Sequence, residues 1–220
     1  KTSQMKIILC LLSLAGCICT LHAQTDTNYN PHDFFTQPFN PPPGNPFRSA
    51  KGIPGPEYWQ NSASYLIQAT LSEKDTSITG DVTITYTNNS PDQLDYLWLQ
   101  LDQNIFKPSS RSVATTIYTG SYPDAPDAIA YGYKIKDVLV SSNGNSYKVD
   151  PIITDTRMQI RLQKPMLPKG DKISLKINFS FNIPPDGAGR FGRQYTKNGV
   201  IYQIAQWYPR MCVYDDVKGW

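Results

Sequence analysis

The chemical group that stands out in this sequence is a glutamine beside two aromatic residues. Gln206 follows a strand-like run, 200–204, in which only Gln203 is polar, and precedes Trp207 and Tyr208. A neutral amide offers both a donor and an acceptor, so beside aromatic rings it can bind the amine or peptide group of a ligand. The other interpretation is a glutamine that is satisfied by the protein backbone. We expect Gln206 to lie on a strand, Gly199–Trp207, and it is the candidate ligand-binding residue.

Histidine is scarce, and this excludes several kinds of catalysis by the chain as given. The two histidines are His22 and His32, and no His-Glu-x-x-His motif exists, so a zinc site of the protease type cannot be built. Catalysis of the Ser-His-Asp or Cys-His kind lacks its base for the same reason. Cys212 is the single cysteine outside the N-terminal leader, so no internal disulfide is expected and Cys212 is interpreted as a small buried hydrophobe. The sequence therefore predicts no catalytic and no metal-binding residue.

A glycine-rich segment, Gly187–Gly192, matches the letters of the dinucleotide-binding fingerprint. A strand is expected before it, but Pro184 and Pro185 intervene and no helix is expected after it. We interpret the segment as a flexible loop between two strands.

Two charged pairs near the end of the chain have alternative interpretations. Asp215 and Asp216 fit a turn capped by Asp, or else a loose calcium site that lacks a third ligand at suitable spacing. Arg190 and Arg193 are expected to be solvated, or else to form ion pairs with a neighbouring domain.

Residues 1–23 have the pattern of a secretory signal peptide. Lys6 precedes the apolar run Ile7–Leu21, which is shorter than the ~20 apolar residues that span a bilayer. Ala23 suits ordinary signal cleavage, whereas Leu14 to Cys17 resembles a bacterial lipobox that would leave Cys17 as a lipidated, membrane-anchored N-terminus. Both routes predict an extracytoplasmic protein, periplasmic or secreted, or an outer-membrane lipoprotein.

Residues 24–57 are rich in proline and lack strand or helix periodicity. They predict an extended linker, or else an arm whose aromatic residues pack on the body or on a partner domain. The aromatic residues concerned are Phe34, Phe35, Phe39 and Phe47. The formal net charge of +3 falls to +1 without Lys1 and Lys6, which argues against nucleic acid as a partner.

Alternation of polar and apolar residues begins at Tyr58 and indicates strands. In Asp171–Ile183, six apolar residues alternate with polar ones, as a strand with one wet face requires. Further strands are expected at Tyr65–Leu71, Val82–Thr87, Leu94–Leu101, Lys134–Ser141 and Arg157–Gln163. No segment keeps a helical period over three turns. The fold class predicted for 58–220 is all-β, a curved antiparallel sheet or β-sandwich of seven or more strands.

Two finer predictions concern strand neighbours. Ser174–Ile183 and Met158–Leu162 are expected to form a hairpin around Pro168 to Gly170. The strand that contains Leu97 to Leu101 is apolar on both faces and is expected to be central in its sheet.

Several segments resemble the N-terminal β domain of aminopeptidase N-like zinc metallopeptidases, the gluzincin aminopeptidases. Tyr65–Leu71 followed by Ile78–Tyr86 is similar to the opening strand pair of that domain, and Asp95–Leu101 to its next strand. Gly189–Tyr195 is similar to a Gly-Phe-Tyr-Arg-Ser loop, and Gln206 to Pro209 to a Gln-Phe-Glu-Pro motif, although Tyr208 replaces the usual Glu.

The resemblance implies that 58–220 is a non-catalytic domain, incomplete at its C-terminus, that walls an active-site cleft. Gln206 would then help to bind the N-terminus of a peptide substrate. The zinc and its His-Glu-x-x-His motif would belong to a catalytic domain beyond Trp220. Two alternatives stay open: a free-standing cell-surface β-sandwich that binds glycans or peptides through exposed Trp59, Trp98 and Trp207, and a pseudo-enzyme that keeps the fold as a scaffold.

Overall fold

A computed structural model describes residues 43–115, 131–184 and 191–220. These residues form eleven strands, a 3-10 helix at Asp102–Phe106 and a five-residue α-helix, α3, at Arg111–Thr115. All strand pairs of the sheets are antiparallel, so the predicted all-β class is confirmed. Within the described residues, no helix has the length and apolar composition that crossing a membrane requires.

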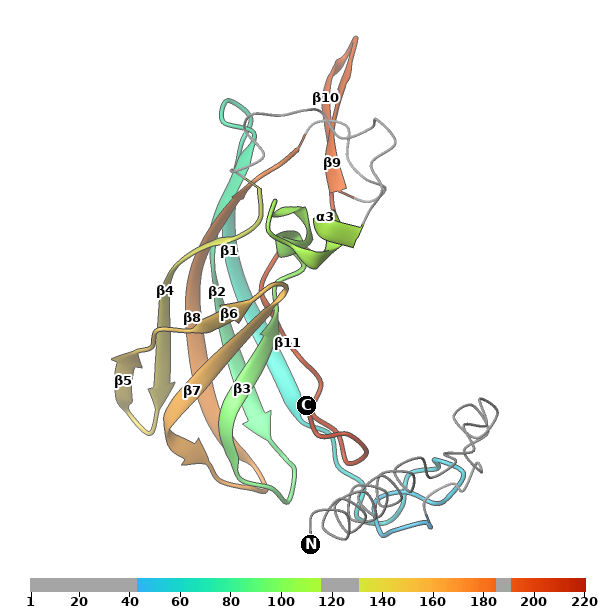
Figure 1. The fold of residues 1–220 in the computed structure, drawn as a ribbon. Helices are drawn as coiled ribbons and strands as arrows, with labels where there is room; N and C mark the ends of the chain where they lie inside the picture. The colour runs from blue at the N-terminus through green and yellow to red at the C-terminus, as the bar shows by residue number, and fades with distance from the viewer. Residues whose placement is uncertain (1–42, 116–130, 185–190) are drawn as a thin grey trace, which may run out of the picture.

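The strands are arranged in two sheets and a separate hairpin (Figure 1). The larger sheet has the order β1-β2-β8-β4-β5: β1 is Ser62–Ser72, β2 Ser77–Asn88, β8 Asp171–Asn182, β4 Lys134–Ser142 and β5 Asn145–Lys148. The smaller sheet has the order β11-β3-β7-β6: β11 is Arg210–Met211, β3 Leu94–Gln100, β7 Arg157–Met166 and β6 Ile152–Thr154. The hairpin of β9 (Phe191–Thr196) and β10 (Gly199–Ile204) projects from one end of the molecule.

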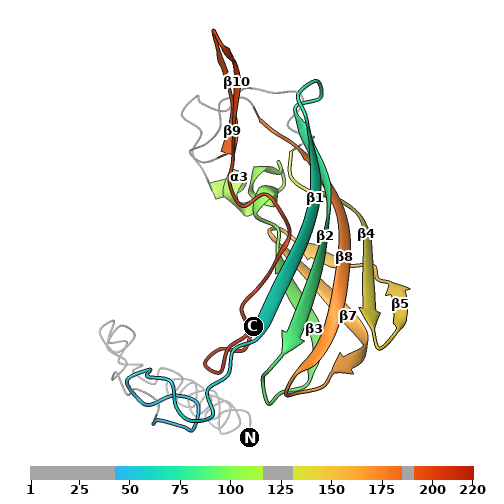
Figure 2. The same ribbon diagram turned by 180° about the vertical axis from the view of Figure 1, so that it is seen from behind.

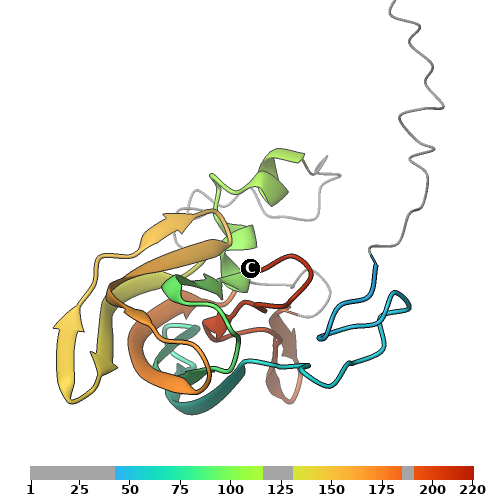
Figure 3. The same ribbon diagram turned by 90° about the horizontal axis from the view of Figure 1, so that it is seen from below.

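The core lies between the two sheets and follows from the alternation in the sequence. In β8 the odd-numbered residues from Ile173 to Phe181 are at most 4% exposed, while Lys172 and Lys176 face solvent. The smaller sheet contributes residues such as Leu97, Leu99 and Ile160, all fully buried. The long strands of the larger sheet bow together over this core (Figures 1 and 2). Seen from below, the segment before β1 lies beside the sandwich (Figure 3).

The predicted hairpin of Met158–Leu162 with Ser174–Ile183 is wrong. β7 belongs to the smaller sheet and β8 to the larger one, so the turn between them carries the chain from one sheet to the other. Buried side chains of both strands, such as Ile160 and Leu175, enter the core from opposite sheets. The sequence pattern indicates only that each strand has one buried face. A hairpin within one sheet and a crossing between two sheets both satisfy that pattern.

The prediction for the strand of Leu97 to Leu101 holds in part. β3 lies between β7 and β11, but β11 pairs with it only at Leu99 and Gln100. Leu97 and Leu99 are fully buried, whereas Trp98 on the other face is half-buried. The expected antiparallel pair at Tyr65–Leu71 and Ile78–Tyr86 is present as β1 and β2.

Candidate functional site

Gln206 lies outside the strands, contrary to the prediction. β10 ends at Ile204, and Gln206 follows in an irregular segment with a φ of 47°. A residue in this left-handed region cannot continue a pleated strand. The side chain of Gln206 is exposed, and it forms no hydrogen bond with the part of the chain that the structure describes.

A second glutamine, Gln103, binds the backbone at Gln206 through hydrogen bonds. Gln103, on the 3-10 helix, is 2% exposed, and its Nε2 donates to the carbonyl oxygens of Ala205 and Gln206, both at 3.0 Å. The hydroxyl of Tyr133 also donates to the Gln206 carbonyl at 3.5 Å. Burial raises the pKa of Tyr133, so its hydroxyl remains a neutral donor. The main chain is therefore positioned by buried polar groups, while the amide of Gln206 stays free.

Sequence reasoning missed Gln103. No periodic pattern marks it, because it lies in a short helix between strands, and an isolated Gln is an ordinary surface residue. The available signal is its place two residues after Leu101, the buried residue that directly follows β3.

The aromatic residues next to Gln206 pack inward. The ring of Trp207 lies 6.4 Å from that of Phe179 and 5.5 Å from that of Tyr208, and Tyr208 lies 5.6 Å from Tyr65. Trp207, like Trp59 and Trp98, is half-buried, so the expectation of exposed tryptophans is wrong. These rings anchor the segment to the sandwich, because stacked and edge-to-face pairs stabilise packing beyond their buried area.

Arg193 is engaged by the protein, contrary to the expectation of a solvated side chain. Its guanidinium donates to the carbonyl of Ile183 and, at 3.1 Å, to the hydroxyl of Tyr195. Arg190 lies outside the described residues, as does most of the segment Gly187–Gly192. Gly192 itself belongs to β9, so a strand follows this segment where a dinucleotide fingerprint needs a helix.

Asp215 caps a turn, as one of the two interpretations predicts. Its Oδ1 accepts from the backbone N–H groups of Val217 at 2.9 Å and Lys218 at 2.8 Å. The hydrogen bond from Lys218 lowers the pKa of this carboxyl. Among the described residues, no group of three or more His, Cys, Asp or Glu side chains is placed to hold a metal ion. Cys212 is half-buried and unpaired, and burial raises the pKa of its thiol.

Part of the proline-rich segment packs on the C-terminal turn. The Arg48 Nε lies 2.7 and 2.8 Å from the two carboxylate oxygens of Asp216, and its guanidinium lies 4.9 Å from the ring centroid of Tyr58. The Asp216 side chain is 4% exposed. Within 43–57, these contacts fit the arm better than the free linker; Phe34, Phe35 and Phe39 lie outside the described residues.

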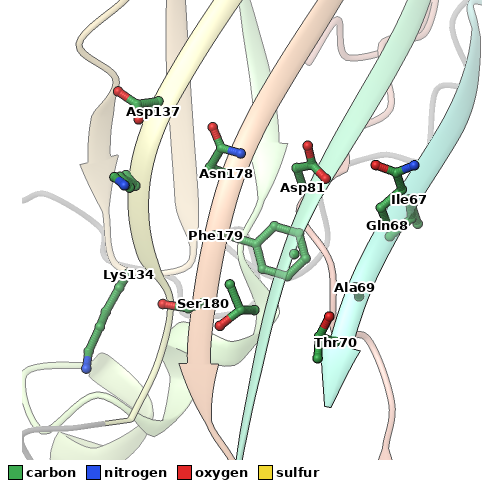
Figure 4. Close-up of a pocket in the computed structure, with 13 residues that line it drawn as sticks. Ile67, Gln68, Ala69, Thr70, Asp81, Lys134, Asp137, Asn178, Phe179 and Ser180 are labelled. Carbon is green, nitrogen blue, oxygen red and sulfur yellow. The ribbon is translucent and has the colours of Figure 1, made fainter. Parts of the chain in front are cut away.

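One cavity, the outer cavity, lies on the solvent face of the larger sheet, with a volume of about 850 Å³ (Figure 4). Register places Gln68, Asp81, Asn178 and Asp137 in one row across β1, β2, β8 and β4. Lys176 pairs with Asp81 at 3.1 Å, and Lys148 pairs with Asp137 at 2.7 Å and lowers its pKa. The amides of Gln68 and Asn178 form no hydrogen bond with other described residues, so this surface is polar and has free donors and acceptors.

A second cavity, the aromatic cavity, lies between the start of β1 and the C-terminal segment, with a volume of about 380 Å³. Its aromatic lining consists of Tyr58, Trp59, Tyr65, Tyr86 and Tyr214. Ser62, Ala63, Met211 and Cys212 also contribute. The Nε1 of Trp59 is buried and has no hydrogen-bond partner in the described part of the chain.

The β9–β10 hairpin exposes large apolar side chains. Tyr195 is 64% exposed, Ile201 55% and Val200 39%. The hairpin and the segment after it run down one side of the sandwich, from the projecting end to the C-terminus (Figures 1 and 2). The exposed amide of Gln206 lies on this segment, between the apolar hairpin and β11. Such a combination of an apolar patch and a free polar group is typical of interaction surfaces.

Comparisons with known proteins give a distant structural likeness. No model of a known protein family matches the chain, and no curated protein matches it. The chain is similar to the crystal structure of a mutant M1 zinc metallopeptidase from Deinococcus radiodurans, at 15% identity and a TM-score of 0.37. A structure of the mutant bound to a Tyr-Ser-Ala substrate gives the same values, and a two-domain M1 zinc metallopeptidase bound to L-tryptophan gives 14% and 0.37. Each alignment covers 62% of this chain, and the chain spans about a quarter of the length of those solved chains (24%).

Proposed function

We propose that residues 58–220 act as a non-catalytic domain of an extracytoplasmic zinc metalloaminopeptidase, where they wall the active-site cleft and help to bind the N-terminus of a peptide substrate. In this proposal the zinc and the catalytic residues belong to another part of the protein, and residues 1–23 direct export or, through Cys17, lipid anchoring. Support comes from the sequence resemblance at Gly189–Tyr195 and at Gln206 to Pro209.

The observation that carries the proposal is the free amide of Gln206 on a rigidly held backbone. A surface side chain is normally mobile, and immobilising it on binding costs free energy. Here Gln103 and Tyr133 hold the carbonyl of Gln206, so the position from which the amide projects is set before a ligand arrives. An amide in this setting can accept from an α-ammonium group and donate to a peptide carbonyl.

The apolar hairpin supplies the second support. Val200, Ile201 and Tyr195 are exposed on a two-stranded hairpin, an element that is marginally stable when it stands alone in water. A domain that packs against it would bury these side chains and bring a cleft wall next to Gln206. The free-standing glycan-binding alternative has weaker support, because the tryptophans that it requires are half-buried.

The test uses the full-length protein that contains this chain. Gln206→Ala is expected to lower kcat/KM on substrates with a free N-terminal amino group by about tenfold, because one or two hydrogen bonds to the ligand contribute about 0.5–1.5 kcal/mol each. The matched control is Gln203→Ala, an exposed glutamine on β10 that should keep the parent's kinetics.

Two results would count against the proposal. Equal kinetics for Gln206→Ala and Gln203→Ala would remove Gln206 from the site. A full-length protein without bound zinc and without peptidase activity would remove the metallopeptidase assignment and leave the pseudo-enzyme.

A further inference from the structure

The two sheets end in four edge strands, and one of these differs from the others. β5, β6 and β11 have four, three and two residues, whereas β1 has eleven. Short edges are one of the devices by which proteins avoid unwanted strand pairing. Three edges of this sandwich have that protection, and β1 lacks it.

β1 also has none of the protective residues or bulges that are common on edge strands, and the C-terminal segment adjoins only its first half, where the Met211 N–H donates to the Tyr65 hydroxyl at 3.0 Å. Its sequence, Ser62–Ser72, has no charged residue, no proline and no glycine, and its register with β2 is continuous without a bulge. No backbone hydrogen bond joins β1 to a described residue other than those of β2. The backbone groups on its outer edge thus have no partner among the residues that the structure describes, and Leu66 beside them is 66% exposed. Figure 4 shows β1 as the border of the sheet.

Both cavities described above adjoin this edge, on alternate faces of the sheet. The aromatic cavity is lined by Ser62, Ala63 and Tyr65; Ala63 packs against the core, and the Tyr65 ring contacts that of Tyr208, which packs there too. The outer cavity is lined by Ile67–Thr70, where Gln68 and Thr70 face the solvent side with Asp81. Side chains of an extended strand alternate in the same way, so a strand added to β1 would direct its side chains toward both cavities.

We propose that the free edge of β1 binds an extended peptide by strand addition. Main-chain hydrogen bonds along the edge provide affinity, and the two cavities select side chains. The peptide carries an aromatic or apolar side chain toward the aromatic cavity and a polar side chain toward Asp81 and Lys134 in the outer cavity. Because β1 has no charge, the middle of the peptide is uncharged. This inference does not depend on Gln206 or on a catalytic domain.

A second copy of the chain fits this edge less well than a peptide. Eleven residues form a strip about 36 Å long and about 5 Å wide, which is about 200 Å². A stable protein–protein interface buries about 800 Å² on each partner. In the full antiparallel register centred on Ile67, the second copy would place Ala69 and Leu71 beside the aromatic cavity, and Leu66 and Ser64 beside the outer cavity. Leu66 would thus bring an apolar side chain to the polar lining of the outer cavity. A free peptide can instead place a polar side chain there.

The experiment uses the 220-residue chain and a short fluorescent peptide of alternating valine and threonine, with one tyrosine and a lysine at each end. Two further peptides carry N-methyl groups on alternate residues, one in each frame. A strand that pairs with the edge directs the N–H groups of every second residue toward β1, so only one set of alternate residues forms hydrogen bonds with it. The peptide methylated on that set should bind about tenfold more weakly or worse, and the other should bind like the parent. Bound peptide should slow hydrogen exchange at Ser62–Ser72 and leave β5 unchanged.

A pair of variants locates the site on the protein. Leu66→Lys places on β1 the residue that natural edges use against pairing, and it also repels the lysines of the probe, so binding should fall severalfold. Leu139→Lys changes an equally apolar, exposed residue inside the same sheet, on β4, and should bind like the parent. Equal binding of both methylated peptides, or equal loss in both lysine variants, would overturn the proposal. Protection of β1 that rises with protein concentration, without peptide, would make a second copy the occupant and would also overturn it.

Discussion

β8 and the C-terminal segment from Gly199 to Trp220 are held in place in opposite ways. β8 has five apolar residues, from Ile173 to Phe181, at every second position, and all of them are buried. The C-terminal segment has a short hairpin strand and a two-residue strand. Single contacts also hold it, including the Gln103 amide, the Arg210–Asp102 ion pair at 2.9 Å and the rings of Trp207 and Tyr208.

This difference separates the contacts that stabilise the sandwich from the contacts that position Gln206. Repeated burial spreads the stabilisation of β8 over many atoms, so each core residue contributes to one cooperative unit. Point contacts hold the C-terminal segment locally, and they allow Gln206 a backbone conformation that a strand would forbid. The region that carries the candidate site is thus the one with the fewest regular constraints, as is common for binding segments on rigid scaffolds.

The largest effect is expected in the sandwich itself. Leu175→Ala removes a fully buried side chain from β8 and should lower the free energy of unfolding by about 2–5 kcal/mol, measured by urea denaturation. Ser174→Ala, on the solvent face of the same strand, should change it by less than about 0.5 kcal/mol. Similar losses for both variants would contradict the stabilising role of the alternating pattern.

The same contrast explains which features the sequence could predict. The alternation in Asp171–Ile183 predicted β8, because a strand with one solvent-exposed face and one buried face alternates polar and apolar residues with a period of two. It could not decide between a hairpin and a crossing between sheets for β7 and β8, since both place the apolar residues inside. The sheet pairing depends on contacts between segments far apart in the sequence.

The candidate site was predictable only at the level of residue type. An amide beside aromatic rings drew attention to Gln206, but its backbone has a φ of 47°, and its carbonyl accepts a hydrogen bond from Gln103, more than 100 residues earlier. The capped turn at Asp215 was predictable because its hydrogen bonds are local, to Val217 and Lys218. Local chemistry could be inferred from the sequence, and distant side-chain contacts could not.

An effect of intermediate size, on the pH dependence of stability, is expected where the C-terminal segment packs on the sandwich. The ring of Trp220 lies 6.1 Å from that of Tyr86, a buried residue of β2. Burial raises the pKa of Tyr86 to about 12, whereas an unfolded chain loses this proton near pH 10. The neutral hydroxyl therefore stabilises the folded state below about pH 10, and up to about 2–3 kcal/mol is lost as the pH rises through about 12.

Tyr86→Phe removes this ionisation and should flatten the loss of stability between about pH 10 and 12, measured by denaturation at several pH values. Buried Tyr133, whose pKa is also raised, remains and keeps part of the slope. Tyr195→Phe, an exposed ring on β9, is the matched control and should show the parent's pH dependence. An unchanged slope in Tyr86→Phe would mean that this junction opens without unfolding of the core.

Substitution of Gln103 is expected to have the smallest effect on the stability of the whole fold and the most localised effect on the segment that it contacts. Gln103→Leu keeps the volume of the side chain but removes two hydrogen bonds to the carbonyls of Ala205 and Gln206, at a cost of about 1–3 kcal/mol. Because the contact is local, hydrogen exchange should accelerate at 204–208 while the amides of β8 keep their rates. Gln163→Leu, an exposed glutamine of β7 whose side chain lies at the surface, should change neither quantity.

If Gln103→Leu instead accelerated exchange across β8 by the same factor as at 204–208, the C-terminal segment would belong to the cooperative unit of the core. Point contacts would then support the whole fold, and the separation of stability from positioning would not hold. If only 204–208 changed, Gln103 would be a positioning residue for Gln206. In the full-length protein the same substitution should then reduce kcat/KM in the same direction as Gln206→Ala, with the sandwich intact.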